Sequence, residues 1–184
     1  MSYDLDEHRH RFAVWAAARA AQRGFTTVGN LRGAIESTDM RKSLSLPVTL
    51  ESSAAQFDKL HEGWCAAIQA FLSDRKIPEA SYGRAAKLVA VYLKSRIVLG
   101  DASNTPLGRN AHPPIDRILL HALASAEEVK SPHKRAWTQT NWTELDGPAY
   151  RELIGQLRAV VPAGAPFWSI EKYWQPSDSG DEAL

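Results

Sequence analysis

The sequence predicts an all-α protein, folded as a single compact domain of about six or seven helices. Three observations favour this class. Apolar residues follow helical spacing almost throughout, no segment alternates apolar and polar residues with period two, and helix caps and breakers recur where the apolar segments end. A length of 184 residues and a hydrophobic content of 44% suit one such domain, which we expect to span residues 1–175.

The first two expected helices lie at 8–23 and at about 28–37. One face of the first helix collects apolar side chains, an alanine run adds strong helix propensity, and Gly24 ends the helix. Thr26 or Thr27 then caps the second helix. The apolar face of the first helix consists of Phe12, Trp15, Ala16 and Ala20.

A loop at 38–51 precedes the third expected helix. Ser53 and Gln56 form the capping-box pattern, in which the serine bonds the third helical amide and the glutamine reaches back to the cap. The helix then extends to about residue 74. Its apolar face includes Phe57, Leu60, Trp64, Ile68 and Leu72.

Two further helices flank a loop rich in glycine, proline and asparagine. We expect the first at 81–99, because Gly100 is a natural helix end. The loop that follows leads to Pro113 and Pro114, and proline is tolerated in the first turn of a helix. The second helix therefore covers about 114–125.

The last part of the chain starts with a basic connector at 126–141. A helix at 146–161 begins with an aspartate and a proline, and a short helix follows at 166–174. Residues 176–184 are acidic, and we expect them to form a disordered tail.

The composition excludes several classes of protein. The single cysteine, Cys65, excludes an internal disulfide framework and a multi-cysteine zinc site. No apolar run approaches the ~20 residues that a membrane helix needs, and the polar first residues show no secretory signal. We therefore expect a cytoplasmic chain without membrane association, and no residue pattern predicts a metal site or a cofactor.

The net charge of +1 conceals a basic region. Residues 75–135 contain eleven Lys or Arg residues against five Asp or Glu residues. Such an excess fits a phosphate-bearing partner such as DNA, and it fits a solvated surface of mixed charge about as well.

The stretch that could carry chemistry lies at 82–123. Lys87 stands in a mostly apolar helical segment, and Lys94 lies two turns later on nearly the same face. A lysine held against apolar surface gives up its proton more easily and becomes a nucleophile, although the commoner outcome is an amine that reaches water. Asp116 stands in the first turn of a helix, where backbone N–H groups favour an ionised carboxylate; a purely structural role fits there too.

This stretch resembles the core of the helix-hairpin-helix (HhH-GPD) DNA glycosylase superfamily. The shared features are a lysine in an apolar helix, a Gly/Pro-rich loop and the segment Pro-Ile-Asp-Arg at 114–117. The archaeal 8-oxoguanine DNA glycosylase branch is the most similar. Two features depart from the superfamily: the hairpin carries only Gly83 where two glycines are usual, and Ala85 stands where most lysine-bearing members place the nucleophile.

The resemblance implies an enzyme that excises a modified base from DNA, with an accompanying AP-lyase step. Lys87 would be the amine that attacks C1′ of the damaged nucleotide. Asp116 would be the carboxylate that helps to activate this amine and supports the developing sugar cation.

An extruded base needs an aromatic wall, and its backbone needs cations. The sequence offers six tryptophans: Trp15, Trp64, Trp137, Trp142, Trp168 and Trp174. We favour Trp137 and Trp142 because they lie in polar connector sequence, where core burial is less automatic. The candidate phosphate contacts are Arg84, Lys94, Arg96, Arg109, Lys134 and Arg135.

The competing hypothesis is a non-catalytic all-α binding or adaptor module for a protein or nucleic-acid partner. The two hypotheses differ in the geometry that they require. A glycosylase needs Lys87 and Asp116 to face one solvent-reachable cleft with an aromatic wall, whereas an adaptor leaves Lys87 in open water. A weaker pattern, His61 and Cys65 one helical turn apart, has no third group to orient a nucleophile.

Overall fold

A computed structural model describes residues 3–22, 24–45 and 53–175, and all regular secondary structure in these ranges is helical. This confirms the all-α prediction; the expected tail at 176–184 lies outside the described residues. The elements are α1 (Leu5–Gln22), α2 (Val28–Glu36), α3 (Met40–Ser45), α4 (Ala54–Asp74), α5 (Tyr82–Leu93), the π-helical η1 (Lys94–Val98), α6 (Pro106–Asn110), α7 (Arg117–Ser125), α8 (Lys134–Gln139), the 3-10 helix η2 (Trp142–Glu144), α9 (Gly147–Arg158) and the 3-10 helix η3 (Phe167–Tyr173).

The described helices outnumber the six or seven that the sequence predicts. Three additional α-helices, α3, α6 and α8, lie in segments expected to be loop or connector, and each has only five or six residues; the three-residue η2 was not expected either. A helix this short does not show apolar periodicity, so only local signals could reveal it. For α6 these are Thr105, which accepts a hydrogen bond from the Gly108 amide at 3.0 Å, and Pro106 in the first turn.

Two of the expected caps are present as hydrogen bonds. Thr27 accepts from the Asn30 amide and caps α2. At the start of α4, Ser53 accepts from the Gln56 amide, and the Gln56 side chain accepts from the Ser53 amide at 2.9 Å, so the capping box is complete.

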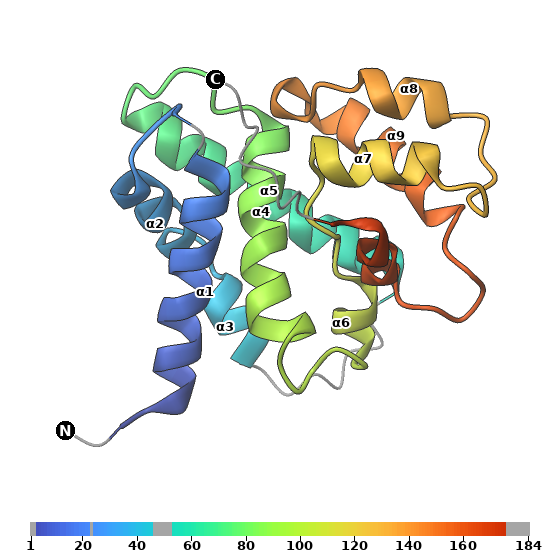
Figure 1. Cartoon of the computed structure of the whole chain (residues 1–184). Helices are drawn as coiled ribbons and strands as arrows, with labels where there is room; N and C mark the ends of the chain where they lie inside the picture. The colour runs from blue at the N-terminus through green and yellow to red at the C-terminus, as the bar shows by residue number, and fades with distance from the viewer. Residues whose placement is uncertain (1–2, 23, 46–52, 176–184) are drawn as a thin grey trace.

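The central element is α5, which lies between α1 and α2 on one side and α7, α8 and α9 on the other (Figure 1). It packs against α1, α4, η2 and α9, and ten of its twelve residues are buried. A helix that is surrounded on all sides needs an apolar or small residue at nearly every position, which explains its Ala- and Val-rich sequence. The exception among these buried residues is Lys87, which brings a charged amine into the interior of the molecule.

The buried face of α1 differs from the expected one. Ala13, Ala17 and Ala18 are fully buried, whereas Phe12 and Trp15 are about half exposed. The reason is steric: α1 lies against α5 and α2, and small side chains on both helices allow a close approach that large aromatic rings would prevent. No described helix is both long and apolar enough to cross a membrane.

Gly83 allows η2 to lie against the start of α5. A Cβ atom at this position would be 1.9 Å from the carbonyl oxygen of Trp142, so no other residue fits without a shift of backbone. The Gly83 amide donates to the Leu145 carbonyl at 2.9 Å, and the Ser81 hydroxyl donates to the Thr143 carbonyl at 2.5 Å. These contacts fix Trp142 next to the first turns of α5.

We predict that Gly83→Ala destabilises the fold by about 1–3 kcal/mol, because the added methyl group forces η2 away from α5. The measurement is the free energy of unfolding in urea. Gly63→Ala on α4 is the matched control: nothing lies within 4 Å of its added Cβ, so it should stabilise by about 0.5–1 kcal/mol. Equal stabilisation by both substitutions would contradict the close approach.

Candidate functional site

Lys87 and Asp116 form a buried ion pair. Lys87 Nζ donates to Asp116 Oδ2 at 2.7 Å, and the two side chains are only 8% and 7% exposed. Lys87 comes from the middle of α5 and Asp116 from the residue before α7, so the pair joins segments 29 residues apart in the sequence. The structure therefore brings together the two residues that the sequence singles out.

Asp116 is placed by its role as a helix cap. The expected helix at 114–125 begins only at Arg117, because Asp116 has extended backbone with φ of −150°. Its Oδ1 accepts from the Leu119 amide at 2.9 Å, which leaves Oδ2 for Lys87. Pro113 and Pro114, both buried, precede it and restrict the backbone that leads to the carboxylate.

Two indole rings border the pair. The Trp174 Nε1 donates to Asp116 Oδ2 at 3.1 Å, and the Lys87 amine lies 5.6 Å from the centroid of the Trp142 ring. Trp174 follows η3, and Trp142 belongs to η2. Sequence reasoning chose Trp142 and passed over Trp174, whose position was marked only by the aromatic-rich end of the last helical segment.

A second ion pair lies beside the first. Lys94 pairs with Glu171 of η3, and the Lys94 amine lies 5.2 Å from the centroid of the Trp174 ring. The site thus combines two lysines and two carboxylates with indoles against both amines. Glu171 was not predicted from the sequence, because a single glutamate in a short helical segment carries no distinguishing signal.

The electrostatic environment keeps Asp116 ionised. Burial alone would raise the pKa of Asp116, but the Lys87 ammonium, the Leu119 amide and the Trp174 indole together hold the pKa below its ordinary value. Glu171 behaves in the opposite way: burial raises its pKa, and its ion pair with Lys94 offsets this only in part. The site therefore holds one firmly ionised carboxylate and one that takes up a proton more readily.

Most of the candidate phosphate contacts have partners within the chain. Arg84 pairs with Glu79 at 3.2 Å, and Arg96 pairs with Asp6; both side chains are mostly buried. Lys94 belongs to the site, as described above. The other three are Arg109, which bonds the Gly164 carbonyl, Lys134, which bonds the Ala126 carbonyl, and Arg135, which is exposed.

Both tryptophans predicted for a base pocket are buried in the hydrophobic core, so the expectation that they escape core burial is wrong, but their contacts differ. Trp142 is 6% exposed and lies against the Lys87 amine. Trp137 is 1% exposed, belongs to the hydrophobic core and donates through its Nε1 to Gln156 at 2.9 Å. Only Trp142 of the two therefore has a described contact with the ion pair.

A separate polar network lies between α4, α9 and the segment before α7. Arg158 donates two hydrogen bonds of 2.6 Å to Asp58, and His112 Nε2 is 2.9 Å from Asp58 Oδ1. The Tyr150 and His61 rings stack at 5.3 Å, next to a cavity of about 60 Å³. Burial lowers the pKa values of His61 and His112, so both are neutral at pH 7.

The His61 and Cys65 pattern does not give an activated thiol. Cys65 Sγ is 3.7 Å from His61 Nδ1, but both residues are buried. Burial raises the pKa of Cys65 and lowers that of His61, which disfavours the thiolate and the imidazolium at once.

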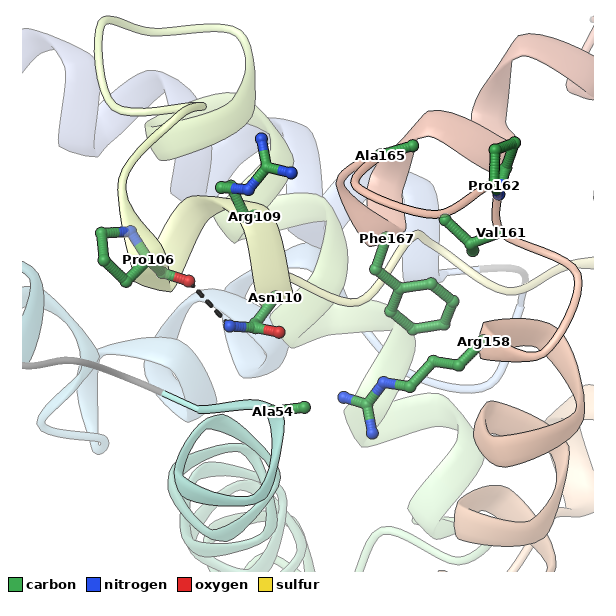
Figure 2. A pocket seen from close by; sticks show the side chains of 9 residues that line it. All are labelled: Ala54, Pro106, Arg109, Asn110, Arg158, Val161, Pro162, Ala165 and Phe167. Atoms are coloured by element: carbon green, nitrogen blue, oxygen red, sulfur yellow. Dashed lines mark hydrogen bonds between the residues drawn. The ribbon is translucent and has the colours of Figure 1, made fainter.

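Two larger cavities lie on either side of the loop before η3. One, of about 490 Å³, is bordered by side chains from α6, α9 and the first residues of α4 and η3 (Figure 2). It contains Arg109 and Arg158, which are engaged with Gly164 and Asp58. The other, of about 550 Å³, lies beside η3 and includes Lys172 and Tyr173. The described lining of neither cavity includes the ion pair.

Within the described ranges, no three His, Cys, Asp or Glu side chains are arranged to hold a metal ion. Comparison with known proteins gave no significant match: no family model, no curated protein and no solved structure matches this chain.

We predict that Lys87→Met or Asp116→Asn alone destabilises the fold by about 3–5 kcal/mol, because either leaves a buried charge without its counterion. The double substitution should cost less than the sum of the two. Arg151→Met, which breaks an exposed ion pair with Glu62, is the control and should cost no more than about 1 kcal/mol. Chemical denaturation measures all four; strict additivity at positions 87 and 116 would contradict the coupling.

We also predict that the free energy of unfolding falls as the pH drops from 7.5 to 5.5. Burial lowers the pKa values of His61 and His112 in the fold, so over this range they bind fewer protons there than in the unfolded chain, where histidine titrates near about pH 6.5. The unfolded state then binds more protons, so stability declines by up to about 1.4 kcal/mol per pH unit for each histidine. Urea denaturation across this range tests the slope, which His112→Gln should reduce and His133→Gln, at an exposed site, should not.

Proposed function

We propose that the protein is a DNA glycosylase with AP-lyase activity, in which Lys87 is the nucleophile and Asp116 the carboxylate that serves it. The observation that carries this proposal is the 2.7 Å contact between Lys87 Nζ and Asp116 Oδ2 in an environment almost closed to water. An amine next to a fixed carboxylate, bordered by aromatic rings, is the arrangement that imine-forming base excision requires. The resemblance at 82–123 supports the same assignment.

The proton and electron movements balance with water as the proton carrier. Lys87 loses one proton to water, and the neutral amine forms a bond to C1′ while the glycosidic C–N bond breaks; Asp116 stays ionised and stabilises the developing sugar cation. The electron pair of the broken bond leaves with the base, which takes up a proton from water. The new secondary amine loses a proton as the sugar ring opens and its ring oxygen is protonated, leaving a C=N bond between Lys87 and C1′. Loss of a proton from C2′ then expels the 3′-phosphate.

Substrate entry requires the segment around Trp174 to give way. The Trp174 indole occupies Asp116 Oδ2, and Lys94 and Glu171 close the neighbouring side. An extruded nucleotide takes the place of the Trp174 hydrogen bond and gains the faces of Trp142 and Trp174 as stacking surfaces. Of the candidate phosphate contacts, Arg135 is the exposed one, so backbone binding includes this residue.

Neither hypothesis meets its geometric requirement in full. Lys87 and Asp116 line none of the three cavities described above, so the solvent-reachable cleft that a glycosylase needs forms only when the segment around Trp174 moves. The adaptor hypothesis fits the ion pair less well. An adaptor leaves the Lys87 amine in open water, whereas this amine is buried and held by a carboxylate. A buried ion pair is weak support for stability, since apolar residues of similar size would do as well. A function that uses the amine accounts for the charge better.

The test is borohydride trapping. The chain is incubated with duplex DNA that contains an abasic site or 8-oxoguanine, sodium borohydride is added, and the covalent complex is resolved on a denaturing gel. We expect a trapped complex whose cross-linked residue, mapped by mass spectrometry, is Lys87. Asp116→Asn should slow trapping by at least about 100-fold.

Lys59→Ala is the matched control, because Lys59 is exposed on α4 and its loss should leave trapping unchanged. Mapping the wild-type adduct avoids dependence on a Lys87 variant that fails to fold. Adducts on several surface lysines, or no adduct from folded protein, would contradict the proposed function and favour the adaptor hypothesis.

A further inference from the structure

The large apolar side chains that the described residues expose are concentrated on one helix. Tyr3, Leu5, Phe12 and Trp15 are 50–74% exposed, and all four lie on α1 or directly before it. Elsewhere in the described ranges only Leu60 and Leu99 are both large and exposed. Single exposed apolar residues are ordinary on a monomer, but a cluster on one helix indicates a surface that another molecule covers.

The positions of these side chains follow the spacing of a helix–helix seam. Leu5, His8, Phe12, Trp15 and Arg19 are separated alternately by three and four residues, and all five are exposed. We call these five residues the α1 stripe. Such spacing keeps one continuous row of side chains facing a partner helix over the length of α1. The Phe12 and Trp15 rings, 5.8 Å apart, form the middle of the row.

The core of the chain does not require this row. The opposite face of α1 is made of Ala13, Val14, Ala17, Ala18 and Ala21, which pack against the rest of the molecule. In Figure 1, α1 lies at the outside of the bundle with α2 and α5 on its other sides. The helix is therefore apolar on two faces, and the fold covers only one of them.

The charges at the two ends of α1 favour a second copy as the partner. Asp6 and Glu7 at the start of the helix are already paired within the chain, with Arg96, Arg41 and Arg11. Among the described ion pairs none involves Asp4 at the start or Arg19 in the last turn, and both residues are exposed. A second α1 running in the opposite direction brings each Asp4 near the partner's Arg19, whereas a nucleic acid offers negative charge to both.

We propose that the chain forms a homodimer through the α1 stripe, with the two α1 helices antiparallel and the two-fold axis between Phe12 and Trp15. In this arrangement Phe12 packs on the partner's Trp15, and Trp15 packs on the partner's Phe12, as an isologous interface requires. Arg19 lies opposite the partner's His8 and one turn, about 6 Å, from the partner's Asp4, within reach of its long side chain.

Analytical ultracentrifugation of the full chain over a range of concentrations tests the interface. We expect a concentration-dependent dimer whose Kd rises at least about 30-fold in Trp15→Glu, because a charge replaces a central aromatic anchor. Leu60→Glu is the matched control, an exposed apolar residue on α4, and should leave the Kd unchanged. A monomer at every concentration, or a dimer that survives Trp15→Glu, would overturn the proposal.

Cross-linking tests the antiparallel arrangement independently of folding stability. Cys65 is the only cysteine and is buried, so His8→Cys and Arg19→Cys each introduce one exposed thiol. After mild oxidation we expect disulfide-linked dimers from the mixture of the two variants and few from either variant alone. Dimers from each variant alone would indicate parallel helices and contradict the proposed axis. Neither result depends on DNA, so failure of this proposal is separable from failure of the proposed enzymatic activity.

Discussion

The Asp116 carboxylate is the interaction on which the site depends, because it serves three donors from three parts of the chain. Its Oδ1 caps α7 through the Leu119 amide, and its Oδ2 accepts from Lys87 of α5 and from Trp174 after η3. A carboxylate removed from water is tolerated only when its oxygens are fully bonded. Here those bonds also fix how α5, α7 and η3 meet, so the electrostatics of one residue set the geometry of its neighbours.

The segment that leads to Asp116 is held at both ends. Four residues earlier in the sequence, His112 Nε2 lies 2.9 Å from Asp58 Oδ1, and Arg158 donates two hydrogen bonds to the same Asp58 carboxylate. Pro113 and Pro114 restrict the backbone between these two anchor points. The hydrogen bonds of His112 therefore help to position the Asp116 carboxylate. A substitution of Asp58 should move His112 and, through residues 113–115, should move Asp116 relative to Lys87.

The helical class and the caps of α2 and α4 followed from sequence, because each depends on local spacing. The meeting of Lys87 with Asp116 was expected only through the resemblance at 82–123, since local spacing does not encode a contact between residues 29 positions apart. The burial of Trp137 and the exposure of Trp15 did not follow, since both depend on which side of a helix finds a neighbour. Glu171 and Trp174 reach the site only through the path of the chain between α9 and η3, and no local pattern encodes that path.

The indole hydrogen bond on Asp116 has a consequence for selectivity. A molecule that uses Oδ2 does not add a bond to a vacant acceptor but exchanges one donor for another, so the gain is a difference between two similar bonds and stays small. A molecule that displaces the indole without donating a hydrogen bond leaves the buried carboxylate with one partner fewer. This costs about 1–3 kcal/mol, and more for a charged group. Selectivity for molecules that bind at Asp116 Oδ2 would therefore come mainly from the unfavourable free energy of binding molecules without a donor, and less from a gain with molecules that have one.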